Sequence, residues 1–313
     1  MKRIVFGETG LEVSAVCYGS WQVDERFWGA SAAADHIDAM RRAVEVGVNF
    51  FDTADAYGEG RSEEVMGEAL SVFDRERLVI TTKVYHNRVG PDSLDVGDLS
   101  RKTIQTRCEE SLKRLRTDYI DIYLAHSYDR FTDIEETVDA LEDLKGKGKI
   151  RHYGMSNFTA EQICLACGYG NWEVVQPRFS FLRPESEDDI LPLARSIGLG
   201  VMTYSPLFYG LLTGKYTGEE TQHRRGHPYF RNLDLFKEIA ARVRALAPVA
   251  EENGLTITQL VLACVLANPM IHACIVGIRN RAYIEEAAGA MEAEISREDY
   301  YRVRRIIGSP PKV

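Results

Sequence analysis

Four polar side chains that could move a proton stand at or just beyond the ends of short apolar segments. Asp52 follows Asn49-Phe50-Phe51, Lys83 ends a run that begins at Leu78, and His126 ends a run that begins at Tyr119. Tyr57 comes five residues after Asp52. A phenol with an ordinary pKa of about 10 is a reluctant acid, but a neighbouring ammonium favours the phenolate and brings this pKa toward working pH.

The four residue types fit the reduction of a carbonyl group. Lys83 is expected to act on the pKa of Tyr57, and Asp52 to keep Lys83 charged and oriented. His126 can hydrogen-bond the substrate oxygen and orient it. Together these groups would protonate a carbonyl oxygen while hydride arrives at its carbon.

Each residue also has an ordinary interpretation when it is taken alone. Tyr57 is one of fifteen tyrosines and could be a surface aromatic. Asp52 could cap a strand end, and His126 could be a satisfied core histidine. Lys83 is harder to dismiss, because an ammonium that closes an apolar strand needs a partner if it is buried. The chemical prediction therefore depends on the combination.

The elements that must position these side chains alternate between short β-branched runs and stretches with helical periodicity. A hairpin is expected first, with Arg3 to Phe6 paired to Glu12 to Ser14 across a turn at Gly7 to Gly10. The expected strands are Val16–Tyr18, Val48–Asp52, Leu78–Lys83, Tyr119–His126, Ile150–Met155, Val174–Gln176, Gly200–Tyr204 and Ala273–Val276. The expected helices are Ser31–Val46, Ser62–Ser71, Leu99–Arg116, Ile134–Lys147, Thr159–Cys167, Glu187–Ser196, two helices within Leu233–Ala267, Arg281–Ala290 and Arg297–Ile307.

Eight alternating units predict a parallel (β/α)₈ TIM barrel with an N-terminal β-hairpin, as a single domain over residues 1–313. A doubly wound sheet is the competing arrangement. In a barrel, Asp52, Lys83 and His126 would emerge together at the carboxyl-terminal face of the strands, where barrel active sites are built. The segment Tyr216–Arg231 is expected to be a long loop over one end of the barrel and a candidate for function.

Composition excludes several classes of function. A net charge of −9 with scattered basic residues disfavours nucleic acid as a partner. The longest apolar stretch noted near the C-terminus, Leu260 to Ala267, is short of the roughly 20 residues that cross a bilayer. No signal-peptide pattern follows Met1, so we expect no membrane partner and a cytoplasmic location. The pair Cys164 and Cys167 is expected to be buried and reduced.

The sequence lacks two motifs, the glycine motif of a Rossmann dinucleotide site and the histidine motif of a zinc site. The segment Gly19-Ser20-Trp21 does not supply the G-x-G-x-x-G of a dinucleotide-binding Rossmann fold. His223 and His227 are separated by a glycine and two arginines, which make neither a zinc motif nor a stable helix. We therefore expect no metal.

The sequence resembles the aldo-keto reductase family along nearly its whole length. The resemblance rests on Gly19-Ser20-Trp21, Phe51-Asp52-Thr53-Ala54-Asp55-Ala56-Tyr57-Gly58, Thr82-Lys83, Ala125-His126, Gly154-Met155-Ser156-Asn157-Phe158, Gln176, Tyr204-Ser205-Pro206-Leu207 and Gly210-Leu211-Leu212-Thr213-Gly214-Lys215-Tyr216. The family is a (β/α)₈ barrel that binds NADP(H), or less often NAD(H), in an extended pose without a Rossmann domain. The resemblance implies Tyr57 as general acid, with Asp52, Lys83 and His126 as its catalytic partners.

The resemblance also implies the remaining site residues. Ser156, Asn157 and Gln176 match the residues that bind the nicotinamide carboxamide, and Tyr204 matches the aromatic on which the nicotinamide stacks. The pyrophosphate would lie against Ser205, Pro206, Leu207, Gly210 and Lys215. Further cofactor contacts are implied at Gly19, Ser20, Trp21, Asp52, Gly277, Arg279, Tyr283 and Glu286. The substrate pocket would include Trp21, Tyr57, Tyr85 and His126.

Two segments depart from the family pattern. After Gln176 the chain reads Pro177-Arg178-Phe179-Ser180, where relatives commonly have a Tyr-Asn pair. In the adenosine segment, Tyr283 and Ala287 replace the usual residues. Arg279 could bind the 2′-phosphate of NADP(H), and Glu286 could meet the adenine amine.

The expected activity is NADP(H)-dependent reduction of a small aldehyde or ketone to an alcohol. One alternative is an NAD-dependent aldose or polyol dehydrogenase. Another is a cofactor-sensing protein similar to the channel-associated β subunits of the family. The sequence does not identify the carbonyl substrate or the oligomeric state.

Overall fold

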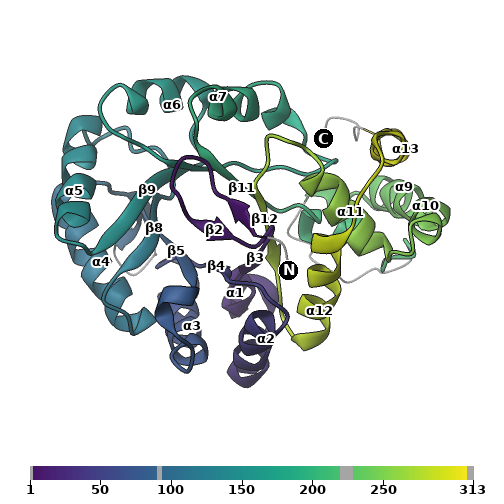
Figure 1. The fold of residues 1–313 in the computed structure, drawn as a ribbon, viewed down its shortest axis with the longest axis horizontal. Coiled ribbons are helices and arrows are strands. Elements are labelled where there is room, and N and C mark those ends of the chain that lie inside the picture. The colour runs from purple at the N-terminus through teal and green to yellow at the C-terminus, as the bar shows by residue number, and fades with distance from the viewer. Residues whose placement is uncertain (1–2, 90–93, 219–227, 309–313) are drawn as a thin grey trace.

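The structure is a computed structural model that describes residues 3–89, 94–218 and 228–308. Its centre is a closed barrel of eight parallel strands in the order β10-β11-β12-β3-β4-β5-β8-β9 (Figure 1). These strands are β3 (Val16–Gly19), β4 (Phe50–Asp52), β5 (Val79–Val84), β8 (Ile120–Ala125), β9 (Ile150–Ser156), β10 (Val174–Gln176), β11 (Gly200–Tyr204) and β12 (Ala273–Gly277). Each of the eight overlaps one predicted strand, with ends that differ by at most two residues, so the (β/α)₈ prediction is confirmed and the doubly wound alternative is wrong.

The helices pack around the outside of the barrel (Figure 1). They are α1 (Glu25–Trp28), α2 (Ala33–Glu45), α3 (Arg61–Leu70), α4 (Arg101–Leu115), α5 (Ile134–Gly146), α6 (Ala160–Cys167), α7 (Ile190–Ser196), α8 (Pro228–Arg231), α9 (Leu233–Arg244), α10 (Ala247–Glu252), α11 (Ile257–Leu266), α12 (Arg281–Gly289) and α13 (Arg297–Ile307). Their apolar faces pack on the outward side chains of the strands, and this shared core includes Phe51, Tyr123 and Val201.

The N-terminal hairpin closes the amino-terminal end of the barrel. Its strands, β1 (Ile4–Val5) and β2 (Glu12–Val13), are antiparallel. Phe6 follows β1, is fully buried, and packs against Phe50 with 5.3 Å between ring centroids. A Cβ on Gly200, at the start of β11, would lie 2.8 Å from the Phe6 ring. The other end of the barrel, where the strands finish, is left for the site.

The region Leu233–Ala267 holds three helices where two were expected. Helix α9 ends before Ala245, and α10 is a separate short helix that has Pro248 near its first turn. Helix α11 starts anew from Thr256, whose side chain caps it. Part of the expected loop Tyr216–Arg231 is also helical, because α8 occupies its end. Residues 219–227, with His223 and His227, lie outside the described residues.

A second hairpin follows β5 and was not predicted. Strands β6 (His86–Val89) and β7 (Leu94–Gly97) pair antiparallel at the carboxyl-terminal face of the barrel. A further correction concerns α6, where Cys164 is exposed and Cys167 is half-buried. Both thiols are free.

Within the part of the chain that the structure describes, no single helix combines the length and apolarity of a membrane span. One pair of segments, Leu233–Glu252 with Ile257–Leu266, meets both criteria only when joined across a bend of 82°.

Candidate active site

A buried ammonium connects the predicted catalytic residues. Lys83 on β5 is fully buried, and its Nζ lies 2.7 Å from Oδ2 of Asp52 on β4. The same nitrogen donates to the carbonyl oxygen of Thr53 at 2.7 Å and contacts the Tyr57 hydroxyl at 3.4 Å. Gln176 on β10 completes the group by donating to Oδ1 of Asp52 at 2.8 Å. The barrel therefore brings these side chains together, as we predicted from the positions of Asp52 and Lys83 at the ends of parallel strands.

The contact between Lys83 and Asp52 favours the charged form of each side chain. Burial alone would lower the pKa of Lys83, but the Asp52 carboxylate and the Tyr57 phenol raise it above its ordinary value. Burial raises the pKa of Asp52, and the Lys83 ammonium and the Gln176 amide oppose that rise.

The pKa of Tyr57 differs from the expectation. Burial raises this pKa to about 12, because the effect of burial exceeds the opposing effect of the Lys83 ammonium. Lys83 thus limits the rise but does not bring the pKa toward neutrality in the unliganded protein. The phenol is protonated at neutral pH, as a proton donor must be.

His126 lies just past the end of β8 and faces Tyr57, with ring centroids 5.8 Å apart. Burial, the Lys83 ammonium and His86 together hold the pKa of His126 well below its usual range. The imidazole is therefore neutral at physiological pH. Its Nδ1 is buried and has no hydrogen-bond partner among the described residues.

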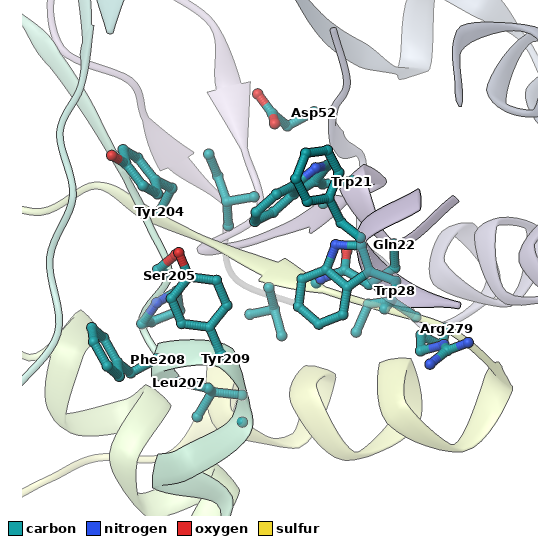
Figure 2. A pocket seen from close by; sticks show the side chains of 18 of the residues that line it. Trp21, Gln22, Trp28, Asp52, Tyr204, Ser205, Leu207, Phe208, Tyr209 and Arg279 are labelled. Carbon is teal, nitrogen blue, oxygen red and sulfur yellow. The ribbon is translucent and has the colours of Figure 1, made fainter. Parts of the chain in front are cut away.

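A cleft of about 1300 Å³ opens above these residues at the carboxyl-terminal face of the barrel. Nearly all of the predicted site residues line it, namely Gly19, Trp21, Asp52, Tyr57, His126, Ser156, Asn157, Gln176, Tyr204, Ser205, Pro206, Leu207, Gly210, Lys215, Gly277, Arg279, Tyr283 and Glu286. Figure 2 shows Tyr204 and Arg279 on opposite sides of this cleft, with Trp28 and Tyr209 between them. The cleft is therefore large enough for an elongated ligand.

Three predicted residues are not among those that line the cleft. Lys83 lies beneath it, in contact with Tyr57. Ser20 is fully buried and donates from Oγ to the backbone oxygen of Asp52 at 2.9 Å, so it supports the strand end from behind. The ring of Tyr85 packs over Gly97, where it fills the space that a Cβ would take.

The residues predicted for the carboxamide are already hydrogen-bonded to one another. Asn157 donates from Nδ2 to the backbone oxygen of His126 at 2.8 Å and to Oγ of Ser156 at 3.2 Å. Ser156 donates to the backbone oxygen of Gln176 at 2.9 Å. Asn157 has a positive φ of 57°, which only a small fraction of non-glycine residues adopt. The strand ends thus fix this side of the cleft.

The segment after β11 has several residues in the left-handed region. Ser205, Phe208, Tyr209 and Gly210 all have positive φ, and they form a compact turn along the cleft. Lys215 follows on this segment, and its Nζ approaches within 3.2 Å of the position of a Cβ on Gly210. Backbone N–H groups together with an ammonium suit a phosphate.

Sequence reasoning missed Trp28, which belongs to the aromatic wall of the cleft together with the predicted Trp21, and one polar residue, His86. Trp28 stacks on Tyr209 with ring centroids 6.3 Å apart, and Trp21 lies 6.1 Å from Tyr57. His86 also lines the cleft, 4.7 Å from the ring of His126. Only the proximity of His86 to Lys83 in the sequence could have indicated it.

The chemistry of the lining fits a nicotinamide dinucleotide. Two buried polar atoms of the cleft, Oε1 of Gln22 and Nε of Arg178, have no hydrogen-bond partner within the described part of the chain. Amide and hydroxyl groups lie at one side of the cleft, and the Lys215 ammonium lies on the segment that follows Tyr204. No group of three or more potential metal ligands occurs among the described residues.

Two of the residues predicted to bind the adenosine end of the cofactor, Arg279 and Glu286, already form hydrogen bonds within the protein. Arg279 donates from Nη2 to the backbone oxygen of Ala30 at 3.3 Å. Glu286 accepts from the Thr256 hydroxyl at 2.8 Å. Tyr283 is 44% exposed, so its ring is accessible to a ligand.

Comparison with known proteins agrees with this geometry. The model of the aldo/keto reductase family matches residues 15–307. A probable voltage-gated potassium channel subunit beta of Arabidopsis thaliana is 35% identical, with 91% of this chain and 90% of that protein covered. An NADH-specific methylglyoxal reductase of Escherichia coli is 32% identical, with 98% of each chain covered.

A solved structure of a related protein also matches along nearly the whole chain. The glycerol dehydrogenase of Gluconobacter oxydans superposes with a TM-score of 0.88 at 27% identity, covering 97% of this chain and 94% of that one. The family match, the closed barrel and the strand-end cluster agree. This chain belongs to the aldo/keto reductase family, a family of NAD(P)H-dependent oxidoreductases.

Proposed function

We propose that the protein reduces an aldehyde or ketone to an alcohol with NADPH, and that Tyr57 is the general acid. The observation that carries this proposal is the contact of 3.4 Å between the Lys83 ammonium and the Tyr57 hydroxyl at the floor of the cleft. A neutral imidazole, His126, faces the same phenol. A carbonyl oxygen bound here would meet one acid and one neutral hydrogen-bond donor.

Each residue has a defined part in the reaction. Tyr57 donates its proton to the carbonyl oxygen, and the phenolate that remains is stabilised by the adjacent Lys83 ammonium. His126 donates a hydrogen bond to the same oxygen and orients the carbonyl group. Ser156, Asn157 and Gln176 would hold the carboxamide of the nicotinamide, and the ring of Tyr204 would cover one face. When bound, the reduced nicotinamide supplies the hydride for the carbonyl carbon.

The variant Tyr57→Phe tests the proposed acid. It removes the transferable proton and keeps the ring, so NADPH should bind as in the wild type while turnover is mostly lost. NADPH binding is followed by fluorescence titration, and turnover by NADPH oxidation with 4-nitrobenzaldehyde. Full activity in this variant would refute the role of Tyr57.

Nucleotide preference is tested at Arg279. A guanidinium binds a 2′-phosphate in a forked geometry, so Arg279→Ala should weaken NADPH binding and leave NADH binding unchanged. The competing function is an NAD-dependent aldose or polyol dehydrogenase, and one relative is named as NADH-specific. If wild type and variant bind NADH equally well and in preference to NADPH, the phosphate clamp is wrong.

A cofactor-sensing role is the second candidate, because two of the relatives above 30% identity are named as probable potassium channel β subunits. The two roles differ in turnover. Steady reduction of 4-nitrobenzaldehyde or methylglyoxal supports the enzyme. Tight cofactor binding without turnover across a broad carbonyl panel supports the sensor.

A further inference from the structure

Two charged residues on the segment after β3 reach across to the loop that carries Tyr57. Asp24 accepts a hydrogen bond of 2.9 Å from the backbone N–H of Gly58, directly after Tyr57. Arg26 donates from Nη2 to the backbone oxygen of Ala56, directly before Tyr57, at 3.1 Å. The two side chains thus hold the backbone on both sides of the tyrosine.

Asp24 and Arg26 are also joined to each other. Nε and Nη2 of Arg26 lie 2.8 and 2.6 Å from the two carboxylate oxygens of Asp24, which is a forked ion pair. The Asp24 side chain is 1% exposed and the Arg26 side chain 35% exposed. Arg26 also forms an ion pair with Glu59 at 2.8 Å, so it contacts Asp24 and two residues of the Tyr57 loop, Ala56 and Glu59, at once. A forked pair of this kind fixes orientation as well as distance.

The Tyr57 loop needs external support because of its backbone. Gly58, Glu59 and Gly60 all have positive φ, at 59°, 56° and 89°. Three successive residues in the left-handed region are uncommon, and Glu59 has a Cβ that disfavours this conformation. Such a conformation persists only where its surroundings hold it.

The phenol itself is held weakly by its catalytic neighbour. The distance of 3.4 Å between Tyr57 and Lys83 is long for a hydrogen bond, so this contact alone does not fix the position of the hydroxyl. The position of the hydroxyl relative to the cleft therefore depends on the backbone on both sides of Tyr57, as well as on the neighbouring rings of Trp21 and His126.

The same pair borders two cavities. Asp24 and Arg26 line the main cleft, and they also line a second crevice of about 460 Å³, which Gly58 and Glu59 line as well. The Tyr57 loop therefore has open space beside it, into which it could shift if the pair were removed.

We propose that Asp24 and Arg26 are positioning residues for Tyr57, acting through the forked pair and its bonds to the backbone at Ala56 and Gly58. The inference rests on the proposed role of Tyr57 as general acid. The pair does not touch the reacting atoms, so its effect should fall on the chemical step. Binding of the dinucleotide should be spared.

The principal test is Arg26→Met, which removes the guanidinium and keeps an apolar stem. The single-turnover rate of NADPH oxidation with 4-nitrobenzaldehyde should fall about tenfold to a hundredfold, as expected for a misplaced catalytic group. The dissociation constant of NADPH should stay close to the wild-type value. The thermal unfolding midpoint should fall, because Asp24 loses its ion-pair partner, but by less than in Lys83→Met, because the Arg26 side chain is 35% exposed. Arg26→Lys retains one ion pair with Asp24 and should recover part of the rate.

Arg42→Met is the matched control. Arg42 is 29% exposed and also has two ion pairs, with Glu45 and Glu285, but it lies on the outer helix α2. Its single-turnover rate should equal that of the wild type. An equal loss of rate in the Arg42 and Arg26 variants would overturn the inference.

The second variant is Asp24→Asn, which has the same shape and breaks the charge pairing. It decides the matter if Arg26→Met does not fold, because it should show the same selective loss of rate. A wild-type rate in Asp24→Asn, or in a folded Arg26→Met, overturns the positioning role. If Tyr57→Phe is inactive in the same assay, only this inference fails, whereas an active Tyr57→Phe overturns the proposed acid.

Discussion

The phenol of Tyr204 donates a hydrogen bond of 2.7 Å to the side-chain oxygen of Asn157. The two residues come from the ends of different strands, β11 and β9. Asn157 is in turn bonded to the backbone of His126. The group proposed to cover the nicotinamide ring and a group proposed to bind its carboxamide are therefore both linked to His126, one of the proposed catalytic residues.

Two variants of Tyr204 distinguish the contribution of its ring to NADPH binding from that of its hydroxyl. Tyr204→Phe keeps the stacking surface and loses one hydrogen bond, whose net contribution of about 0.5–1.5 kcal/mol predicts at most about a tenfold weaker NADPH affinity. Tyr204→Ala loses the surface as well and should weaken binding further. Fluorescence titration measures both. Equal affinities of the Phe and Ala variants would contradict stacking on this ring.

Lys83→Met should affect stability and activity together. It leaves the Asp52 carboxylate buried without its ion-pair partner, and breaking a buried pair costs about 3–5 kcal/mol in the free energy of unfolding. The double variant Lys83→Met with Asp52→Asn should regain much of that stability, because no buried charge remains. Urea denaturation measures the stability. Neither variant should turn over 4-nitrobenzaldehyde, and activity in the double variant would contradict the role of the ammonium.

The barrel could be predicted because its strands are short runs of mostly apolar or β-branched residues that are buried on both faces. Segments such as Val79–Val84 and Ile120–Ala125 are fully buried and read as strands without any tertiary information. The hairpin of His86–Val89 with Leu94–Gly97 has no such signal, since polar residues interrupt its short strands. The extra break before Ala247–Glu252 was hidden because helical periodicity continues across it.

The catalytic group could be predicted because its members stand at strand ends, which a parallel barrel brings to one face. The contributions of Asp24, Arg26 and Trp28 could not be predicted in this way. They depend on the path of the segment after Gly19, which no local pattern specifies. The pKa of Tyr57 was also inaccessible, because it depends on how far burial exceeds the effect of Lys83.

The neutral state of His126 predicts a stability change with pH. Its folded pKa is lowered, so below about pH 6.5 the unfolded chain binds a proton that the folded protein does not. The free energy of unfolding should therefore fall as the pH drops from about 7 to about 5, by at most about 1.4 kcal/mol per unit for this residue. In His126→Gln the fall should be smaller. Some dependence of stability on pH should remain in this variant, because burial also lowers the pKa values of His36 and His272. Parallel curves for variant and wild type would contradict the assignment.

For Asp55 we expect the opposite dependence of the free energy of unfolding on pH. This carboxyl is 6% exposed, and burial together with nearby Glu63 raises its pKa to about 7, while Arg107 and Arg114 oppose the rise. A raised folded pKa means that the stabilising contribution is complete below the unfolded pKa and is lost as the pH rises through about 7.

The variant Asp55→Asn removes this titration and keeps the shape of the side chain. Because the wild type must ionise a buried carboxyl at high pH, the variant should gain stability relative to wild type between about pH 5.5 and about pH 8.5. Urea denaturation at the two pH values measures the difference. A stability difference that is the same at both would mean that Asp55 titrates alike in the folded and unfolded states, contrary to its burial.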